Sequence, residues 1–194
     1  MEPPSSGPQV KSLTFVTLRH VLFSSFVDER GDKVLSAVWD ELDLEARTTL
    51  QSAEPGGWVD EHLMLNVMET VLQTGFGGDS AAYLDFVRGL AAAGISRFLK
   101  VFLSLTSARF ALRRVPVVWS HMRRNAGTVD VAREEDGIRL TYVGFPFFAH
   151  EAYRLLSAAN CEALAQAAAG KAPHARVESW STDSLELYFD LKAA

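Results

Sequence analysis

Residues 128–189, TVDVAREEDGIRLTYVGFPFFAHEAYRLLSAANCEALAQAAAGKAPHARVESWSTDSLELYF, decide the fold of this chain. Polar and apolar side chains alternate over residues 128–133, and again over residues 138–143. Such alternation is typical of strands with one buried face. The polar stretch Glu134–Gly137 lies between them and ends in the glycine of a tight turn. This half of the segment therefore predicts an antiparallel hairpin that Gly144 closes.

The second half of the segment predicts a helix and another hairpin. The alanine-rich run over residues 150–169 has high helix propensity, and Gly170 and Pro173 are stop signals behind it. Residues 176–180 and 185–189 again show strand patterns, on either side of a Ser-Thr-Asp-Ser turn. The whole segment is thus expected to form an antiparallel ββαββ unit, in which the helix covers one face of the sheet.

The residues before this unit predict helices. Apolar side chains recur there with the spacing of one helical face, and Gly, Pro and Asp interrupt them. Pro116 kinks or divides the last helix. Because the helices precede the strands as a block, we expect an α+β fold, with N-terminal helices packed with the C-terminal antiparallel ββαββ unit. The expected helices cover residues 15–27, 34–42, 63–72, 79–90, 95–105 and 107–125, with a short turn at 44–50 and with Trp58-Val59 leading into the third helix.

The length and composition are those of one domain. A chain of 194 residues with 48% hydrophobic residues can build one well-buried core, whereas two full domains would be tight. The Pro- and Ser-rich start shows no signal-peptide pattern. We therefore expect a flexible tail over residues 1–10 and a single α+β domain over residues 11–192.

Charge, hydropathy and cysteine content argue against several functional classes. A net charge of −5 disfavours a chain that binds nucleic acid over its whole surface. The longest apolar stretches are too short, or too interrupted by Arg97 and Lys100, to cross a bilayer. The single cysteine, Cys161, has no intramolecular disulfide partner, which favours a reducing compartment and predicts a cytoplasmic protein.

Three stretches carry a resemblance to a known superfamily. They are FSSFVDERGDKVL at residues 23–35, GTVDV at 127–131 and RLTYVGFP at 139–146. With the order of elements, they resemble the 4-vinyl-reductase-like domain and the wider ligand-binding superfamily of heme-nitric-oxide-binding (H-NOX) sensors and TRAPP trafficking subunits. The chain is similar in particular to an uncharacterised paralogous family found in myxobacteria. The resemblance covers residues 10–192 and implies a ligand-binding regulatory domain that dimerises through its helices, as its relatives do.

The sequence departs from that superfamily at the cofactor sites. H-NOX proteins hold heme through a helical histidine and a Tyr-x-Ser-x-Arg motif. Here residues 79–90 and 95–110 contain no histidine, and Tyr153 is followed by Arg-Leu-Leu-Ser. Phenol-sensing relatives bind zinc through cysteines near the closing hairpin, which has none here, and the five histidines lack metal-ligand spacing. We therefore expect neither heme nor a metal.

Aromatic side chains supply a candidate ligand pocket between the helices and the sheet. A site for a small apolar ligand is lined mostly by such groups. Each of these residues is equally well explained as ordinary core. The candidate lining residues are Phe86, Phe98, Phe102, Trp119, Phe145, Phe147 and Phe148.

Five arginines lie close together in an otherwise acidic chain: Arg109, Arg113, Arg114, Arg123 and Arg124. Guanidinium groups suit phosphates and carboxylates, so this cluster is a candidate site for an anionic ligand or an acidic partner. A solvated helix face, paired with neighbouring carboxylates, is the competing explanation.

Cys161 is a candidate acylation site, because a helical cysteine can carry an acyl chain in TRAPP subunits. It lies in the middle of the expected helix at residues 150–169. Most free cysteines in such places are buried and inert, which is the competing interpretation.

Two functional classes remain open. The first is a non-catalytic sensor or regulatory module that holds a small apolar ligand between helices and sheet. The second is a homodimeric protein-interaction adaptor that binds no ligand. An enzyme is disfavoured, because no nucleophile–base pair or metal-ligand set is visible in the sequence.

Overall fold

The computed structural model describes residues 7–24, 37–95, 106–171 and 173–192. Helices and two antiparallel sheets form an α+β fold in them, which confirms the predicted class. The expected helical residues 25–27, 34–36 and 96–105 lie outside the described residues.

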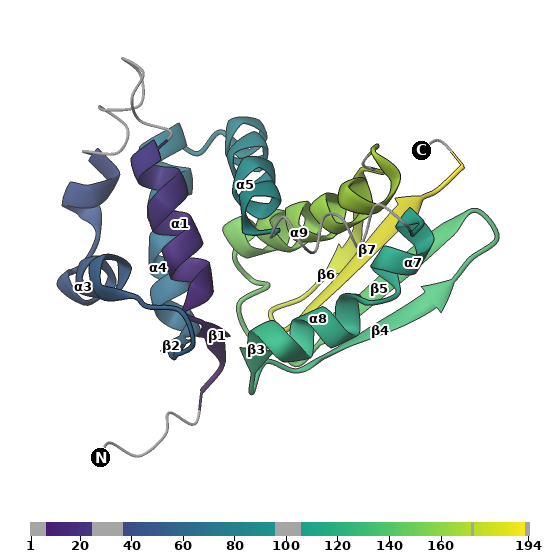
Figure 1. Cartoon of the computed structure of the whole chain (residues 1–194), viewed down its shortest axis with the longest axis horizontal. Coiled ribbons are helices and arrows are strands. Elements are labelled where there is room, and N and C mark those ends of the chain that lie inside the picture. The colour runs from purple at the N-terminus through teal and green to yellow at the C-terminus, as the bar shows by residue number, and fades with distance from the viewer. Residues whose placement is uncertain (1–6, 25–36, 96–105, 172, 193–194) are drawn as a thin grey trace.

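The C-terminal unit is a four-stranded antiparallel sheet with a long helix against it (Figure 1). Its strands have the order β4-β5-β7-β6, because the second hairpin places β7 next to β5. This arrangement leaves β4 and β6 at the two edges of the sheet. Every element of the unit lies within one residue of its predicted bounds. The elements are β4 (Thr128–Arg133), β5 (Gly137–Val143), α9 (Glu151–Ala169), β6 (Ala175–Trp180) and β7 (Ser184–Asp190).

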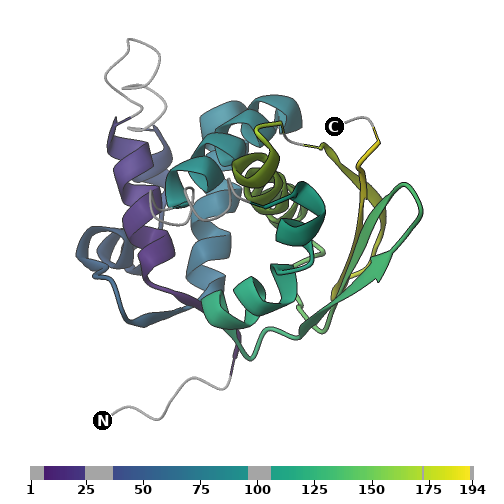
Figure 2. The same cartoon turned by 45° about the vertical axis from the view of Figure 1, so that its right-hand side comes forward.

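The pleat of the central strands decides which face of this sheet is covered. Successive side chains of a strand point to opposite faces. Leu140 on β5 is fully buried and lies opposite Leu187 on β7, whereas their neighbours Arg139 and Tyr188 form a half-buried pair on the other face. The helices all lie on one side of the sheet, and in this view none covers its outer face (Figure 2).

The N-terminal part of the chain is helical, as expected. Its helices are short, and Asp43 and Asp79 accept hydrogen bonds from the first backbone amides of α3 and α5, respectively. A π-helical turn, η1 (Val71–Gly75), follows directly on α4. Residues 37–41 are also helical. The named helices are α1 (Leu13–Ser24), α3 (Leu44–Ser52), α4 (Glu61–Thr70), α5 (Ser80–Gly94), α7 (Ala108–Leu112) and α8 (Val115–Met122).

Pro116 stands in the first turn of α8, and the expected last helix is divided in front of it. Proline fits the first turn of a helix, because the amide it lacks has no partner there in any case. The break between α7 and α8 falls at Arg113 and Arg114. Of the two predicted outcomes, a kink or a division, the chain shows the division.

A small second sheet was missed by the sequence patterns. It consists of β1 (Gln9–Lys11), flanked by β2 (Trp58–Asp60) and β3 (Arg123–Arg124), in the order β2-β1-β3. Gln9 and Val10 therefore belong to a strand, although they were expected in the flexible tail, and Trp58-Val59 forms a strand instead of leading directly into a helix. Strands of two or three residues are too short for a visible alternation, and their partners lie far along the chain.

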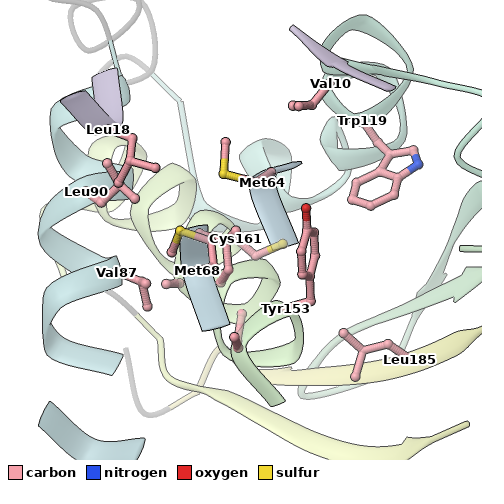
Figure 3. Close-up of a cluster of buried hydrophobic side chains, with 14 of the residues drawn as sticks. Val10, Leu18, Met64, Met68, Val87, Leu90, Trp119, Tyr153, Cys161 and Leu185 are labelled. Carbon is pink, nitrogen blue, oxygen red and sulfur yellow. The ribbon is translucent and has the colours of Figure 1, made fainter. Parts of the chain in front are cut away.

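The two parts of the chain share one hydrophobic core. Buried side chains from β1, α4, α8 and α9, among them Val10, Met64, Trp119 and Tyr153, belong to a single cluster (Figure 3). Among the described residues, no helix has the length and apolar character that a membrane crossing requires.

Candidate functional site

A charged cluster lies at the junction of the helical part with the C-terminal unit. It consists of Glu61, Arg123 and Tyr153, which we call the buried triad. Glu61 is the first residue of α4, Arg123 lies in β3, and Tyr153 belongs to the first turn of α9. The small sheet explains the meeting of these elements, because β1 is flanked by β2, which leads into α4, and by β3, which contains Arg123.

The carboxylate of Glu61 is the centre of the buried triad. Its side chain is 0% exposed, and that of Arg123 is 10% exposed. The hydroxyl of Tyr153 donates to Glu61 Oε1 at 2.7 Å, and Arg123 Nε donates to the same oxygen at 3.2 Å. Glu61 Oε2 is buried without a hydrogen-bond partner in the described part of the chain. A buried charge is tolerated only when it is paired, and this pair connects three elements.

Burial and the charge of Glu61 shift the pKa values of the other two members of the buried triad. Burial is the largest single influence on Arg123 and lowers its pKa, but the charge of Glu61, the interaction with Tyr153 and the hydrogen bond to Glu61 together raise the pKa above its usual value. Burial, and then the charge of Glu61, raise the pKa of Tyr153 well above 10.0. Tyr153 thus remains a neutral hydrogen-bond donor, and Arg123 remains charged. Such an arrangement holds the fold together and offers no nucleophile.

Aromatic rings surround the buried triad. The guanidinium of Arg123 lies 4.4 Å from the ring centroid of Trp119 and 5.8 Å from that of Phe145. The Trp119 and Phe145 ring centroids are 5.1 Å apart, and those of Phe145 and Phe148 are also 5.1 Å apart. Phe147 is half-buried and lies against Phe145 at 5.1 Å. The structure therefore brings together four of the predicted pocket residues, Trp119, Phe145, Phe147 and Phe148.

Phe86 lies in a different aromatic group. Its ring contacts Phe76 at 5.5 Å and Tyr83 at 6.4 Å, on the side of α5. Phe98 and Phe102, the remaining pocket candidates, are outside the described residues.

The five clustered arginines have three different surroundings. Arg109 donates to the backbone oxygens of Glu134 and Gly137 and so holds the β4–β5 turn. Arg113 and Arg114 are exposed, and Arg114 lies over the Phe110 ring at 4.9 Å.

The other two arginines of the cluster point to opposite faces of the small sheet. Arg123 belongs to the buried triad, whereas Arg124 donates to Gln9 and lies 4.7 Å from the Trp58 ring. Successive strand residues face opposite sides, which is why these neighbours differ so much. The five arginines therefore do not form one surface, which corrects the expectation of a single cluster. Arg109, Arg123 and Arg124 make hydrogen bonds to other parts of the chain, and Arg113 and Arg114 remain as the exposed pair.

Cys161 lies on the inner side of α9. It is 2% exposed, and its sulfur is 3.2 Å from the hydroxyl of Tyr142. Burial raises the pKa of the Cys161 thiol to about 12, so the nucleophilic thiolate is scarce near neutral pH. Acylation at this position would require that α9 first move away from the sheet.

A second charged cluster lies on the surface, in a groove between α5 and α9. Glu162 accepts from Arg88 Nε at 2.7 Å and from the backbone amide of Ala175 at 2.8 Å, and His174 Nδ1 is 3.7 Å away. Small side chains, among them Ala92 and Ala163, line the rest of the groove. The sequence showed no signal for this pair, because Arg88 and Glu162 come from different helices far apart in the chain.

The comparisons with known proteins indicate a fold and no closer relationship. No protein-family description and no curated protein sequence matches this chain. Three solved structures share its fold. One, a mutant of Cs H-NOX that carries 4-cyano-L-phenylalanine, is 15% identical, covers 93% of this chain and 95% of its own, and has a TM-score of 0.57.

The other two structures concern heme distortion. A member of the H-NOX family is 13% identical over 93% of this chain and 92% of its own, with a TM-score of 0.55. A protein in which porphyrin distortion modulates heme redox potential is 12% identical over 93% and 97%, with a TM-score of 0.53. The chain therefore has the fold of H-NOX domains.

The histidines, Cys161 and Tyr153 of this chain do not fit heme. Heme iron is held by a histidine, a thiolate, a methionine or a tyrosine. All five histidines lie at the surface, since His20, His62, His121 and His174 are exposed and His150 is half-buried. Cys161 and Tyr153 are buried, but both stay protonated and are held by Tyr142 and Glu61, respectively. The described residues form no group of three potential metal ligands.

Proposed function

We propose that this chain is a non-catalytic regulatory or sensor module that uses the H-NOX fold without heme. The buried triad is the observation that carries this proposal. An ion pair and a tyrosine occupy the junction of helices and sheet, and aromatic rings pack around them. A group that connects three elements in this way responds to any ligand or partner that moves one of them.

The ligand in this proposal is small and apolar, and it binds between the helices and the sheet. Trp119, Phe145, Phe147 and Phe148 supply the aromatic surface, and Phe147 is the one of these four that is only half-buried. Flat apolar molecules pack well on such rings. The unpaired Glu61 Oε2 would give the same site one hydrogen-bond acceptor.

Native mass spectrometry tests this function. The protein is purified and measured under native and denaturing conditions, and a mass excess that denaturation removes is identified. We expect such an excess for the wild type and its loss in Phe147→Ala. Phe86→Ala, in the other aromatic group, is the matched control and should keep the excess. Equal native and denatured masses for the wild type would refute the ligand.

A titration with hemin separately tests the hypothesis that this chain binds no heme. The wild type should show no stoichiometric binding in a titration followed by the Soret band, because the histidines lie at the surface and Cys161 and Tyr153 stay protonated and hydrogen-bonded. A saturable Soret shift at one hemin per chain would contradict the proposal directly.

The alternative function is a homodimeric interaction adaptor without a ligand. The close ring contacts between Trp119, Phe145 and Phe148 favour it, since rings that fill one another's space form an ordinary core. Neither function involves catalysis. A cytoplasmic location, acylation of Cys161, anion binding at Arg113 and Arg114, and membership of the myxobacterial paralogous family remain proposals alongside it.

A further inference from the structure

The edge strand β6 has exposed apolar side chains, which is unusual for a sheet edge. Val177 is 39% exposed and Trp180 is 53% exposed. They are two of the six large hydrophobic side chains that are exposed among the described residues. Natural proteins usually protect edge strands with charges or cover, because an exposed edge pairs readily with another strand.

The opposite edge strand, β4, is covered. Val129 on β4 is 6% exposed, and Val131 is half-buried and packs against the core. On β6, in contrast, Val177 lies opposite Leu187 of β7, and Trp180 lies opposite Leu185. These leucines are buried on the face of the sheet that carries the helices, so Val177 and Trp180 belong to the same face at its edge. On β6, Ala175 packs against the core and Arg154 of α9 lies 3.9 Å from the Trp180 ring centroid, but Val177 and about half of Trp180 stay exposed.

The charges on β6 are self-complementary. Arg176 and Glu178 flank Val177, and within one chain they form an ion pair. Arg176 and Glu178 stand two residues apart on the strand, so they face the same side of the sheet, and an irregularity of the register falls between Val177 and Ser179. If two β6 strands pair antiparallel about a two-fold axis through Val177, Arg176 of each copy lies opposite Glu178 of the other. Opposite charges in such cross-strand positions stabilise pairing.

We propose that β6 is a self-association surface and that its partner is β6 of a second copy of this chain. Val177 meets its own counterpart at the axis, and the two Arg176–Glu178 ion pairs form between copies instead of within each one. The backbone of β6 gains hydrogen bonds that no described strand supplies on that side. Both surfaces of a two-fold interface are the same patch, so it must be complementary to itself, as this one is.

The proposed interface differs from the helix-mediated dimer that the family resemblance implies. It also stands apart from the proposed regulatory function, since it does not depend on any bound ligand. An interface built from one short strand is smaller than that of a permanent dimer, so association should be reversible and concentration-dependent.

Sedimentation equilibrium with charge-reversal variants tests the proposal. Arg176→Glu places two glutamates opposite each other at both ends of the pairing, and Glu178→Arg does the same with arginines. Each variant alone should dissociate at least tenfold more readily than the wild type. An equimolar mixture should form heterodimers, because each charge then meets its opposite. The doubly reversed chain, Arg176→Glu with Glu178→Arg, should regain the homodimer.

Arg133→Glu is the matched control. It reverses an exposed arginine at the end of the covered edge strand β4 and changes the net charge by the same amount as Arg176→Glu. It should associate like the wild type, and circular dichroism should confirm that all variants are folded. A wild type that sediments as a single chain of 21.3 kDa at every concentration would overturn the proposal. Unchanged association of both single variants would do the same and would assign the dimer to another surface.

Discussion

Two of the glutamate–arginine pairs among the described residues lie in very different surroundings. Glu61 and Arg123 are 0% and 10% exposed, and Tyr153 and the aromatic rings surround them. Glu162 is 4% exposed, but its partner Arg88 is 33% exposed and lies in a surface groove. The Glu61–Arg123 pair is therefore expected to contribute more to stability than the Glu162–Arg88 pair. The reason is the exposure of the cation. Water screens the charge of Arg88 and can hydrogen-bond to it in place of the glutamate, whereas Arg123 is mostly shielded from water.

The largest effect is expected for Glu61→Gln. This change leaves the Arg123 guanidinium buried without a counter-charge, and breaking a buried pair in this way costs about 3–5 kcal/mol. Urea denaturation followed by circular dichroism measures the loss in the free energy of unfolding. Glu54→Gln, at an exposed glutamate, is the control and should change it by less than about 0.5 kcal/mol.

A double substitution sharpens this result. When Glu61→Leu and Arg123→Met are combined, no charge is left unpaired, and the destabilisation should be clearly smaller than that of Glu61→Leu alone. If the two losses simply add, the side chains do not act as a pair, and the description of the buried triad would be wrong.

A smaller loss is expected for Glu162→Gln, on the order of 1.5–3 kcal/mol. After the change, Arg88 can hydrogen-bond to water. The backbone amide of Ala175 can still donate to the side-chain oxygen of the new glutamine, which is a weaker acceptor than the carboxylate. The two pairs should also differ in how their contribution to stability depends on salt. Raising the ionic strength to about 1 M should reduce the effect of Glu162→Gln and leave that of Glu61→Gln almost unchanged, because buried charges are screened less. Equal salt dependence would show that the two pairs have similar exposure.

The Cys161 thiol predicts a pH dependence that belongs to the buried region. Its pKa is raised from 9.0 to about 12 in the folded chain. The unfolded chain therefore releases the proton first as the pH rises, and stability is lost above pH 9. The expected loss between pH 8 and pH 10 is about 1.4 kcal/mol. Cys161→Ala should lack this part of the slope, which denaturation midpoints across that range will show. A wild-type slope equal to that of the variant would mean that the thiol is not buried.

The smallest effect is expected at the surface. Arg113→Ala removes an exposed side chain at the end of α7 and should change the free energy of unfolding by less than about 0.5 kcal/mol. Arg109→Ala is the informative neighbour, because it removes two hydrogen bonds to the β4–β5 turn and should cost about 1 kcal/mol. Thermal denaturation of both variants compares them. If Arg113→Ala lowered the free energy of unfolding more than Arg109→Ala did, the different surroundings described for these two arginines would be wrong.

The elements of the buried triad show why the sequence predicted the fold better than the site. Arg123 was assigned to a solvated or anion-binding cluster, and Glu61 carried no signal. Their proximity depends on β1 pairing with β2 and β3, which are separated from it by long stretches of chain. Strands this short leave no periodic pattern, and only their tertiary contacts define them.

The sequence by itself determined the ββαββ unit and the helical character of the first part. Both follow from local periodicity, since alternation over six residues and helical spacing over ten specify an element without reference to its partner. The sequence also indicated which aromatic side chains could pack between the helices and the sheet, and four of them do so beside the buried triad. The tertiary structure alone decided which charges are buried, that Phe86 lies apart from the other aromatics, and that β6 is left uncovered at the edge. Those properties depend on contacts between residues far apart in the chain, and burial, which sets the energy of every charge, exists only after those contacts form.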